Sequence, residues 1–187
     1  MPPELREVPT EIRTARLVLR RPQPGDGAHL HAAIHTSLPE LKPWAPWAQK
    51  PLDAEGYEVS LRHAASRFLV RQELRYLIFD ASQQTLMGST GFHALDWSVP
   101  KAEIGYWIAT PHAGQGYVTE AVEALTEFGF DTLGFRRIEI RCDPLNERSH
   151  TIARRLNYQL DGHLVNNVVA ADDPSCLRDT LIFSRVR

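Results

Sequence analysis

Residues 107–120 of the chain read Trp107-Ile108-Ala109-Thr110-Pro111-His112-Ala113-Gly114-Gln115-Gly116-Tyr117-Val118-Thr119-Glu120. This stretch runs from an apolar, strand-like segment through a turn with two glycines into the start of an amphipathic helix. Glycine allows tight turns and lets a ligand approach the backbone amides closely. The first amides of a helix have no partner within the helix, and the helix dipole favours an anion there. The stretch therefore predicts a strand–loop–helix unit that binds a phosphate or pyrophosphate.

The glycine pair does not match two common nucleotide-binding loops. It lacks the Gly-Lys-Ser/Thr of a P-loop, and it lacks the third glycine of a dinucleotide fingerprint. A Gly-x-Gly before a helix is also typical of an ordinary turn. The ligand therefore depends on what surrounds the loop, and a nucleotide-binding or phosphate-binding domain stays open at this point.

The N-terminal part of the chain predicts one strand followed by two helices. Arg13–Arg21 is strand-like, and Asp26 is placed to cap a helix over Ala28–His35. The prolines within Leu41–Trp47 exclude a regular helix there, because they interrupt its hydrogen-bonding pattern. A longer helix is expected over Asp53–Arg71, with its first residue as the cap.

The segments on either side of the glycine loop alternate between strands and helices. Before the loop, three strands are predicted, over Tyr76–Phe79, Leu86–Leu95 and Ala102–Ala109. After the loop, a helix with an apolar face is predicted from Val118 to Gly129, and it ends near Gly134. A strand over Arg137–Cys142 follows, and then a short helix that Asn146 caps and Asn157 ends. The last two strands are predicted over Tyr158–Val165 and Cys176–Val186.

These elements predict one mixed α/β domain over residues 1–187, in the order β-α-α-β-β-β-α-β-α-β-β. A length of 187 residues fits one domain with a sizeable core. The chain shows no internal repeat and no low-complexity segment.

The composition argues against several classes of function. The net charge of −2 gives no basic footprint for nucleic acid. No apolar stretch is long enough to span a bilayer, and the first residues lack the apolar core of a signal peptide. Two cysteines are too few for a disulfide framework. We therefore expect a cytoplasmic protein that contacts neither a membrane nor nucleic acid directly.

Further motifs accompany the loop along nearly the whole chain. They are Thr14–Arg20, Glu103–Ile108, Tyr117–Ala121, Asn146–Ser149, Leu156–Tyr158 and Arg178–Ile182. In kind and in order they resemble the GNAT superfamily of N-acetyltransferases, in particular its RimJ/RimL branch of ribosomal-protein N-terminal acetyltransferases. The resemblance implies a mostly antiparallel sheet splayed around a cofactor cleft, with helices on both faces and acetyl-CoA as the co-substrate.

The resemblance also assigns the cofactor-binding residues. The implied set is Ile108, Ala113, Gly114, Gln115, Gly116, Tyr117, Val118, Thr119, Asn146 and Ser149. Two of these positions depart from the family, because Ala113 stands where Gln or Arg is usual and Val118 where Gly or Ala is usual. We expect weaker or slightly shifted pyrophosphate binding as a result.

Glu103 and Ser149 are the candidate catalytic residues. The attacking amine must be neutral, and Glu103 could take its proton through a water molecule. An N-terminal α-amine has a pKa of about 7.7–8.0, so a strong base is not required. By the resemblance, Ser149 lies near the sulfur and could protonate the leaving thiolate. The alternatives are a solvated strand carboxylate for Glu103 and a simple helix cap for Asn146.

The acceptor side has four candidates: Trp44, Trp47, Tyr106 and Asp179. The two tryptophans either anchor an irregular loop in the core or wall the acceptor pocket. Tyr106 points to the opposite face of its strand from Glu103, unless a bulge rotates the strand. Asp179 either pairs with a nearby arginine or recognises the amine.

No metal site is predicted. His29 and His31 do not share a helical face, and no carboxylate or cysteine converges on the pair His31 and His35. Cys142 ends an alternating strand and is expected to be a small core residue. The sequence places no histidine beside it, so it is not a candidate acyl-carrying nucleophile.

The predicted function is transfer of the acetyl group of acetyl-CoA to a primary amine by direct attack in a ternary complex. The acceptor is the N-terminal amine of a ribosomal or other protein, or alternatively a small-molecule amine or polyamine. A CoA-binding module without turnover would need the loop but neither Ser149 nor Glu103. The resemblance also implies a homodimer formed through the C-terminal strands.

Overall fold

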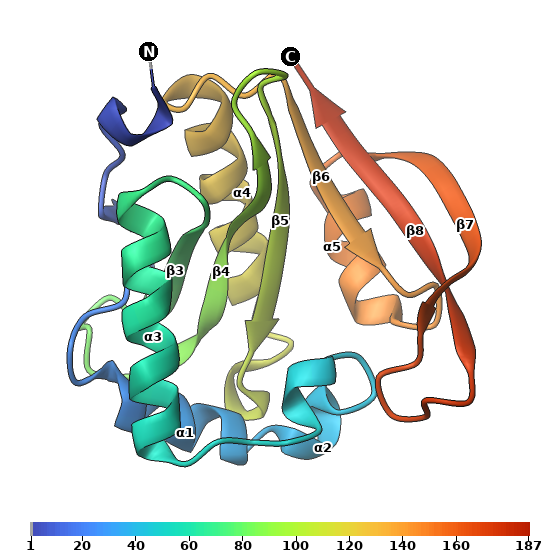
Figure 1. The fold of residues 1–187 in the computed structure, drawn as a ribbon, viewed down its shortest axis with the longest axis horizontal. Helices are drawn as coiled ribbons and strands as arrows, with labels where there is room; N and C mark the ends of the chain where they lie inside the picture. Colours follow the sequence, from blue (N-terminus) through green and yellow to red (C-terminus); the bar gives the residue numbers. More distant parts are fainter. Residues whose placement is uncertain (1) are drawn as a thin grey trace.

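The computed structural model describes residues 2–187, which form one eight-stranded sheet with helices on both faces (Figure 1). The strands are β1 (Glu11–Arg13), β2 (Leu17–Arg20), β3 (Leu74–Asp80), β4 (Leu86–Asp96), β5 (Lys101–Ile108), β6 (Arg137–Cys142), β7 (Gln159–Val169) and β8 (Leu177–Val186). The helices are α1 (Asp26–His35), α2 (Leu38–Leu41), α3 (Ala54–Leu69), α4 (Tyr117–Asp131) and α5 (Glu147–Arg155). Short 3-10 turns are formed by Pro3–Leu5, Pro46–Ala48 and Thr110–His112.

The sheet splits where its one parallel pair lies. The strand order is β1-β2-β3-β4-β5-β6-β8-β7, and all neighbours are antiparallel except β5 and β6. These two strands pair only at their beginnings, Lys101–Glu103 with Arg137–Glu139. Beyond Glu103 they diverge, and the sheet continues as two halves on either side of the split (Figure 1). The expected mixed α/β fold with a splayed, mostly antiparallel sheet is confirmed.

Helix termini follow the predicted local signals. The Asp53 carboxylate accepts the amide of Gly56 at 2.8 Å and caps α3. The Asn146 side chain accepts the amide of Ser149 at 3.1 Å and caps α5. Asn157, after α5, has a left-handed φ of 60°. Asp53 and Asn146 start helices because their side chains accept hydrogen bonds from amides that have no partner within the helix. Asn157 ends a helix because asparagine tolerates a left-handed backbone conformation that most residues avoid.

Two predictions for the N-terminal region are wrong. The segment Arg13–Arg21 is not one strand. It contains the last residue of β1, a turn and the strand β2, which together form part of a β1–β2 hairpin. The turn is stabilised by Thr14, whose hydroxyl accepts a hydrogen bond from the amide of Leu17 at 2.9 Å. Asp26 does not cap α1 but is its first residue, and its carboxylate instead forms a 2.7 Å ion pair with Arg20. The structure also adds the short α2, which the sequence order omitted.

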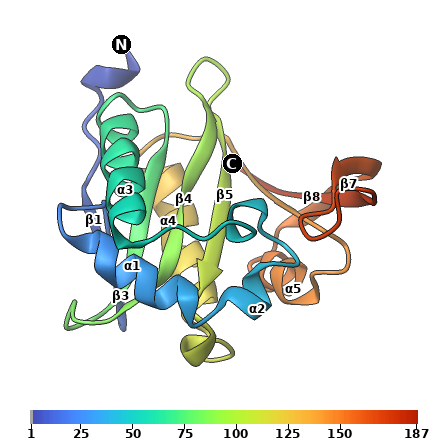
Figure 2. The same cartoon turned by 60° about the horizontal axis from the view of Figure 1, so that its bottom comes forward.

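Two apolar cores lie on the two faces of the sheet. The helices α1, α2 and α3 pack over one face, where Leu30, Leu41 and Leu61 meet Leu77 and Phe79. The helices α4 and α5 cover the other face, as the turned view shows for α4 (Figure 2). No helix within residues 2–187 combines the length and apolar character needed to cross a membrane.

Candidate active site

The split between β5 and β6 opens into a cleft of about 1470 Å³. Its walls come from both halves of the sheet, from the start of α5, from the loop before α4 and from the segment between α2 and α3. A cleft of this size can hold an extended cofactor together with part of a second substrate.

The loop before α4 presents unbonded backbone amides at one end of this cleft. Gly114 and Gly116 have left-handed φ angles of 76° and 80°, which glycine adopts without strain. The six amides of residues 114–119 donate to no acceptor within residues 2–187, and the first bond of the helix runs from the amide of Glu120 to the carbonyl of Gly116. A side chain at position 114 would meet nothing within 4 Å, so the space beside the Gly114 Cα is open. Free amides at the start of a helix are groups that can donate hydrogen bonds to an anion.

Arg16 supplies a positive charge to the same loop, which the sequence did not reveal. Its guanidinium donates to the carbonyl of Gln115 at 3.1 Å and to the carboxylate of Glu120 at 2.6 Å, and it lies 4.4 Å from the ring centre of Tyr117. Thr14 adds a 2.6 Å hydrogen bond to the same carboxylate. Burial would raise the pKa of Glu120, but the bonds from Thr14 and Arg16 outweigh it and lower that pKa.

Ala113 and Val118, the two positions that depart from the pattern of the resembled family, differ in burial and in whether the backbone amide is bonded. Ala113 lines the cleft, but its amide is bonded to the carbonyl of Thr110 at 3.1 Å and is not free for a ligand. Val118 packs into the core under the loop and is 9% exposed, while its amide remains free. Arg16 brings a guanidinium to the loop from another segment, where it donates to the carbonyl of Gln115.

Glu103 lies at the point where β5 and β6 diverge. One carboxylate oxygen is 3.1 Å from Nε2 of His93, its partner across the β4–β5 pair, and the other is 3.4 Å from Arg141 on β6. His93 and Arg141 line the cleft, but Glu103 itself does not. His93 and Arg141 therefore lie between the Glu103 carboxylate and the cleft, and each of them contacts both.

Tyr106 and Ser149 meet across the split. The Tyr106 hydroxyl donates to the Ser149 carbonyl at 3.0 Å and lies 3.1 Å from the Ser149 hydroxyl. Burial raises the pKa of Tyr106, and the hydrogen bond with Ser149 offsets only part of that effect, so this phenol stays protonated at neutral pH. The β5 register is regular from Glu103 to Ile108, and Tyr106 faces away from Glu103 as alternation predicts.

Comparison with known proteins decides the family. The model of the acetyltransferase (GNAT) domain matches residues 16–159. The chain belongs to the GNAT acetyltransferase family. It is therefore an acyltransferase, an acetyl-CoA-dependent N-acetyltransferase.

Named relatives support the RimJ/RimL branch of this family. The chain is 30% identical over 151 residues to the putative ribosomal N-acetyltransferase YdaF of Bacillus subtilis, which covers 78% of this chain and 79% of YdaF. It is 33% identical over 89 residues to the ribosomal-protein-serine acetyltransferase of Escherichia coli, covering 48% of this chain and 49% of that protein. It also matches the N-acetyltransferase p20 of Bacillus licheniformis at 34% identity, where the match spans 52% of that relative's length.

Solved structures share the fold over nearly the full chain. The microcin self-immunity acetyltransferase MccE, solved with acetyl-CoA and AMP, superposes with a TM-score of 0.87 at 20% identity and covers 96% of this chain and 98% of its own. RimL, a ribosomal alpha-N-protein acetyltransferase solved with coenzyme A, gives 0.84 at 24% identity and covers 96% and 97%. At these identities the likeness shows the GNAT fold, and the two neighbours themselves bind acetyl-CoA or CoA.

The predicted acceptor-side residues of this GNAT domain divide into two groups. Trp44 and Trp47 are 39% and 46% exposed and line the cleft, so their interpretation as core anchors is wrong. The Trp47 ring lies 5.9 Å from that of Trp107 on the cleft wall. Asp179 lies outside the cleft lining, and its partner is His163 at 2.7 Å rather than an arginine.

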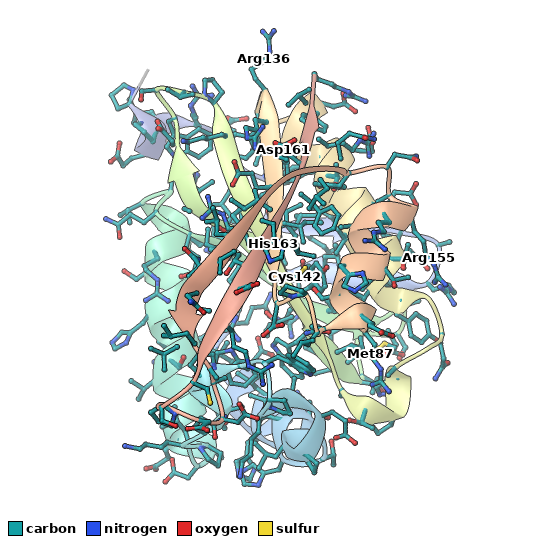
Figure 3. The ribbon with its side chains drawn as sticks, turned by 90° about the vertical axis from the view of Figure 1, so that its right-hand side faces the viewer. Met87, Arg136, Cys142, Arg155, Asp161 and His163 are labelled. Atoms are coloured by element: carbon teal, nitrogen blue, oxygen red, sulfur yellow. The ribbon has the colours of Figure 1, made fainter. Side chains whose placement is uncertain are left out.

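The structure also places the histidine, acid and cysteine side chains that are relevant to metal or thiol chemistry. Within residues 2–187, no three His, Cys, Asp or Glu side chains gather in a group that could hold a metal ion. Cys142 ends β6 beside α5 and is half-buried at the cleft (Figure 3). Burial raises its pKa to about 11, so it is a neutral thiol at physiological pH.

Proposed function

We propose that this protein transfers the acetyl group of acetyl-CoA directly to a primary amine while both substrates are bound, and that residues 1–187 work as one domain. One observation carries the proposal: Gly114 and residues 116–119, whose amides are free, line the same cleft as the Tyr106–Ser149 pair and His93. The names of YdaF and of the E. coli relative favour a ribosomal protein as the acceptor, and that of RimL, an alpha-N-protein acetyltransferase, favours its N-terminal amine. Such an acceptor places the enzyme in the cytoplasm.

Cofactor binding would use backbone groups at two places. The pyrophosphate would accept hydrogen bonds from the amides of residues 114–119, with Arg16 adding charge at the rim. The thioester would lie along the free edge of β5. The amide of Ala109 bonds to Met87 on β4, so strand alternation turns the amide of Ile108 toward the split. The cap residue Asn146 borders the acetyl end.

The reaction would proceed through a tetrahedral intermediate. The neutral amine attacks the thioester carbonyl carbon, and the oxyanion accepts a hydrogen bond from the amide of Ile108. The amine proton passes through His93, which lines the cleft, to the carboxylate of Glu103. The carbon–sulfur bond then breaks, and Ser149, hydrogen-bonded to Tyr106, donates a proton to the thiolate and regains one from solvent, while Glu103 releases to solvent the proton taken from the amine. The products are the acetylated amine and free CoA.

The test is a thiol-release assay on purified protein with acetyl-CoA and a panel of amines. The panel holds peptides that copy ribosomal-protein N-termini, lysine side-chain analogues and polyamines. We expect CoA release that depends on the peptide N-terminus, with the acetyl group located there by mass spectrometry. Tight acetyl-CoA binding without CoA release on any amine would instead identify a CoA-binding module. Calorimetric preference for ATP over CoA would overturn the assignment of the loop.

A further inference from the structure

The part of the cleft beside α3 has a floor that crosses three strands. Arg75 on β3 pairs with Gly91 on β4, and Gly91 pairs with Gly105 on β5, so the three residues form one row on the same face of the sheet. Neither glycine carries a side chain, and β3 and β4 approach closely at this point, because a Cβ on Gly91 would lie 2.4 Å from the Leu74 carbonyl oxygen. His93 stands at the far end, with its ring 3.1 Å from where a side chain on Gly105 would begin. All four residues line the cleft.

Arg75 brings a positive charge into this space, in which the carboxylate of Glu73 also lies. Its Nε donates to the Ser89 hydroxyl at 3.1 Å, and within residues 2–187 no carboxylate lies within ion-pair distance of its guanidinium. The neighbouring acid, Glu73, is held by Arg67 at 2.6 Å. Burial lowers the pKa of Arg75, and the nearby charge of Glu73 offsets only part of that effect. An arginine fork with four unused N–H groups suits a carboxylate or phosphate.

A second group in the same cleft also lacks its partner. Tyr57 on α3 is 5% exposed and lines the cleft, yet its buried hydroxyl has no hydrogen-bond partner within residues 2–187. Buried hydroxyls in folded proteins are nearly always bonded. Tyr57 and Arg75 thus leave polar groups unpaired on the α3 side, while Trp47 and Trp107 supply apolar wall beside them.

We propose that the acceptor is an amine that also carries an anionic group, a carboxylate or a phosphate, and that Arg75 binds this group. The inference rests on the proposed function, because it uses the same cleft. The row from Arg75 to Gly105 crosses two strand spacings, roughly 10 Å between backbones, and the arginine side chain shortens the remaining gap. Only a few covalent bonds therefore separate the acceptor amine at His93 from its anionic group at Arg75. A small amino acid has such a spacing, and so does a peptide with an acidic residue near its N-terminus.

Matched pairs of probes measure this preference directly. One pair is β-alanine and β-alaninamide, and the other is a short peptide beginning Ser-Asp and the same peptide beginning Ser-Asn. Calorimetry on the protein with CoA bound gives the affinity of each probe. In the wild-type protein, we expect the anionic member of at least one pair to bind about tenfold more tightly than the neutral one, the effect of one charged hydrogen-bonded contact. The pair that shows the preference identifies the source of the anion.

Arg75→Gln should abolish this preference, and Arg75→Lys should retain part of it. Arg62→Gln is the matched control, since Arg62 is an exposed residue of α3 that does not line the cleft. Thermal unfolding and acetyl-CoA affinity check that Arg75→Gln leaves the fold and the loop intact. Equal binding of charged and neutral probes to the wild type, or a preference that survives Arg75→Gln, would overturn the inference. A charge preference without acetyl transfer to any amine would leave the anion site standing and remove the proposed function instead.

Discussion

The proposed protonation of the CoA thiolate depends on the hydroxyl groups of Tyr106 and Ser149, which lie 3.1 Å apart. We expect Ser149→Ala and Tyr106→Phe each to lower kcat by about tenfold to a hundredfold, at or below the usual range for general acids because a thiolate leaves readily. The double variant should lose little more, since the two groups act as a unit. The KM for acetyl-CoA should hardly change, because the loop amides are untouched.

Steady-state kinetics with the best acceptor measures these effects. Tyr158→Phe is the matched control: it also removes a buried tyrosine hydroxyl, one bonded to Thr126 at 2.7 Å outside the cleft, and should leave kcat unchanged. Wild-type kcat in both Ser149→Ala and Tyr106→Phe would exclude this pair from proton transfer.

Cys142 gives a prediction about alkaline stability. Burial raises its pKa from the ordinary 9.0 to about 11, so the unfolded chain releases this proton at a lower pH than the folded protein does. The unfolded state binds fewer protons between about pH 9 and pH 11, and the free energy of unfolding therefore falls as the pH rises through that range. Urea unfolding of the wild type and of Cys142→Ala should show a shallower pH dependence in the variant. Parallel pH dependences would contradict the assigned burial effect, whatever the offset between the two curves.

At the scale of elements, the turn before β2 is fastened to the first turn of α4. Thr14 and Arg16 bind the Glu120 carboxylate, and Arg16 also holds the Gln115 carbonyl of the anion-binding loop. We expect Arg16→Gln to raise the KM for acetyl-CoA by about threefold to tenfold, because it removes charge at the pyrophosphate and one restraint on the loop. The kcat at saturation should stay near the wild-type value.

A neighbouring arginine provides the control for this change. Arg13→Gln alters an exposed residue of β1 whose partner is Glu11, and it should leave the KM for acetyl-CoA unchanged. If both variants change this KM equally, the effect comes from net charge and not from the fastening of the loop.

How far the sequence predicts an element depends on whether its cause is local. Caps such as Asp53 and Asn146, the apolar face of α4 and the alternation of β6 act within a few residues, and the sequence placed them correctly. The contact of Arg16 with Glu120 joins residues 104 positions apart, and no local pattern signals it. The pairing of His93 with Glu103 depends on the β4–β5 register, which a bulge next to Ala94 (φ 49°) shifts by one residue. The glycine loop before α4 could therefore be predicted from the sequence. The contacts of Arg16 with Glu120 and of His93 with Glu103 could be found only in the folded structure.

At the scale of the whole molecule, β7 forms one edge of the sheet and exposes apolar side chains. Val165, Val168 and Val169 are 71%, 46% and 53% exposed, and one edge of β7 has no neighbouring strand within residues 2–187. Natural proteins normally shield such an edge. We propose that β7 faces a second copy of this chain in a homodimer, and we expect light scattering after size exclusion to give twice the mass of the chain.

Val165→Lys should convert this dimer to a monomer, because it places a charge at the most exposed apolar position of the strand. Val59→Lys, at a 51% exposed valine of α3, introduces the same charge away from β7 and should leave the dimer intact. A wild-type protein that remains monomeric as its concentration is raised would contradict the assignment of this edge. Because the cleft is lined by residues of one chain and none of them belongs to β7, the Val165→Lys monomer should still bind acetyl-CoA with wild-type affinity. Loss of that affinity would show that the second copy supports the cleft, which the lining residues give no reason to expect.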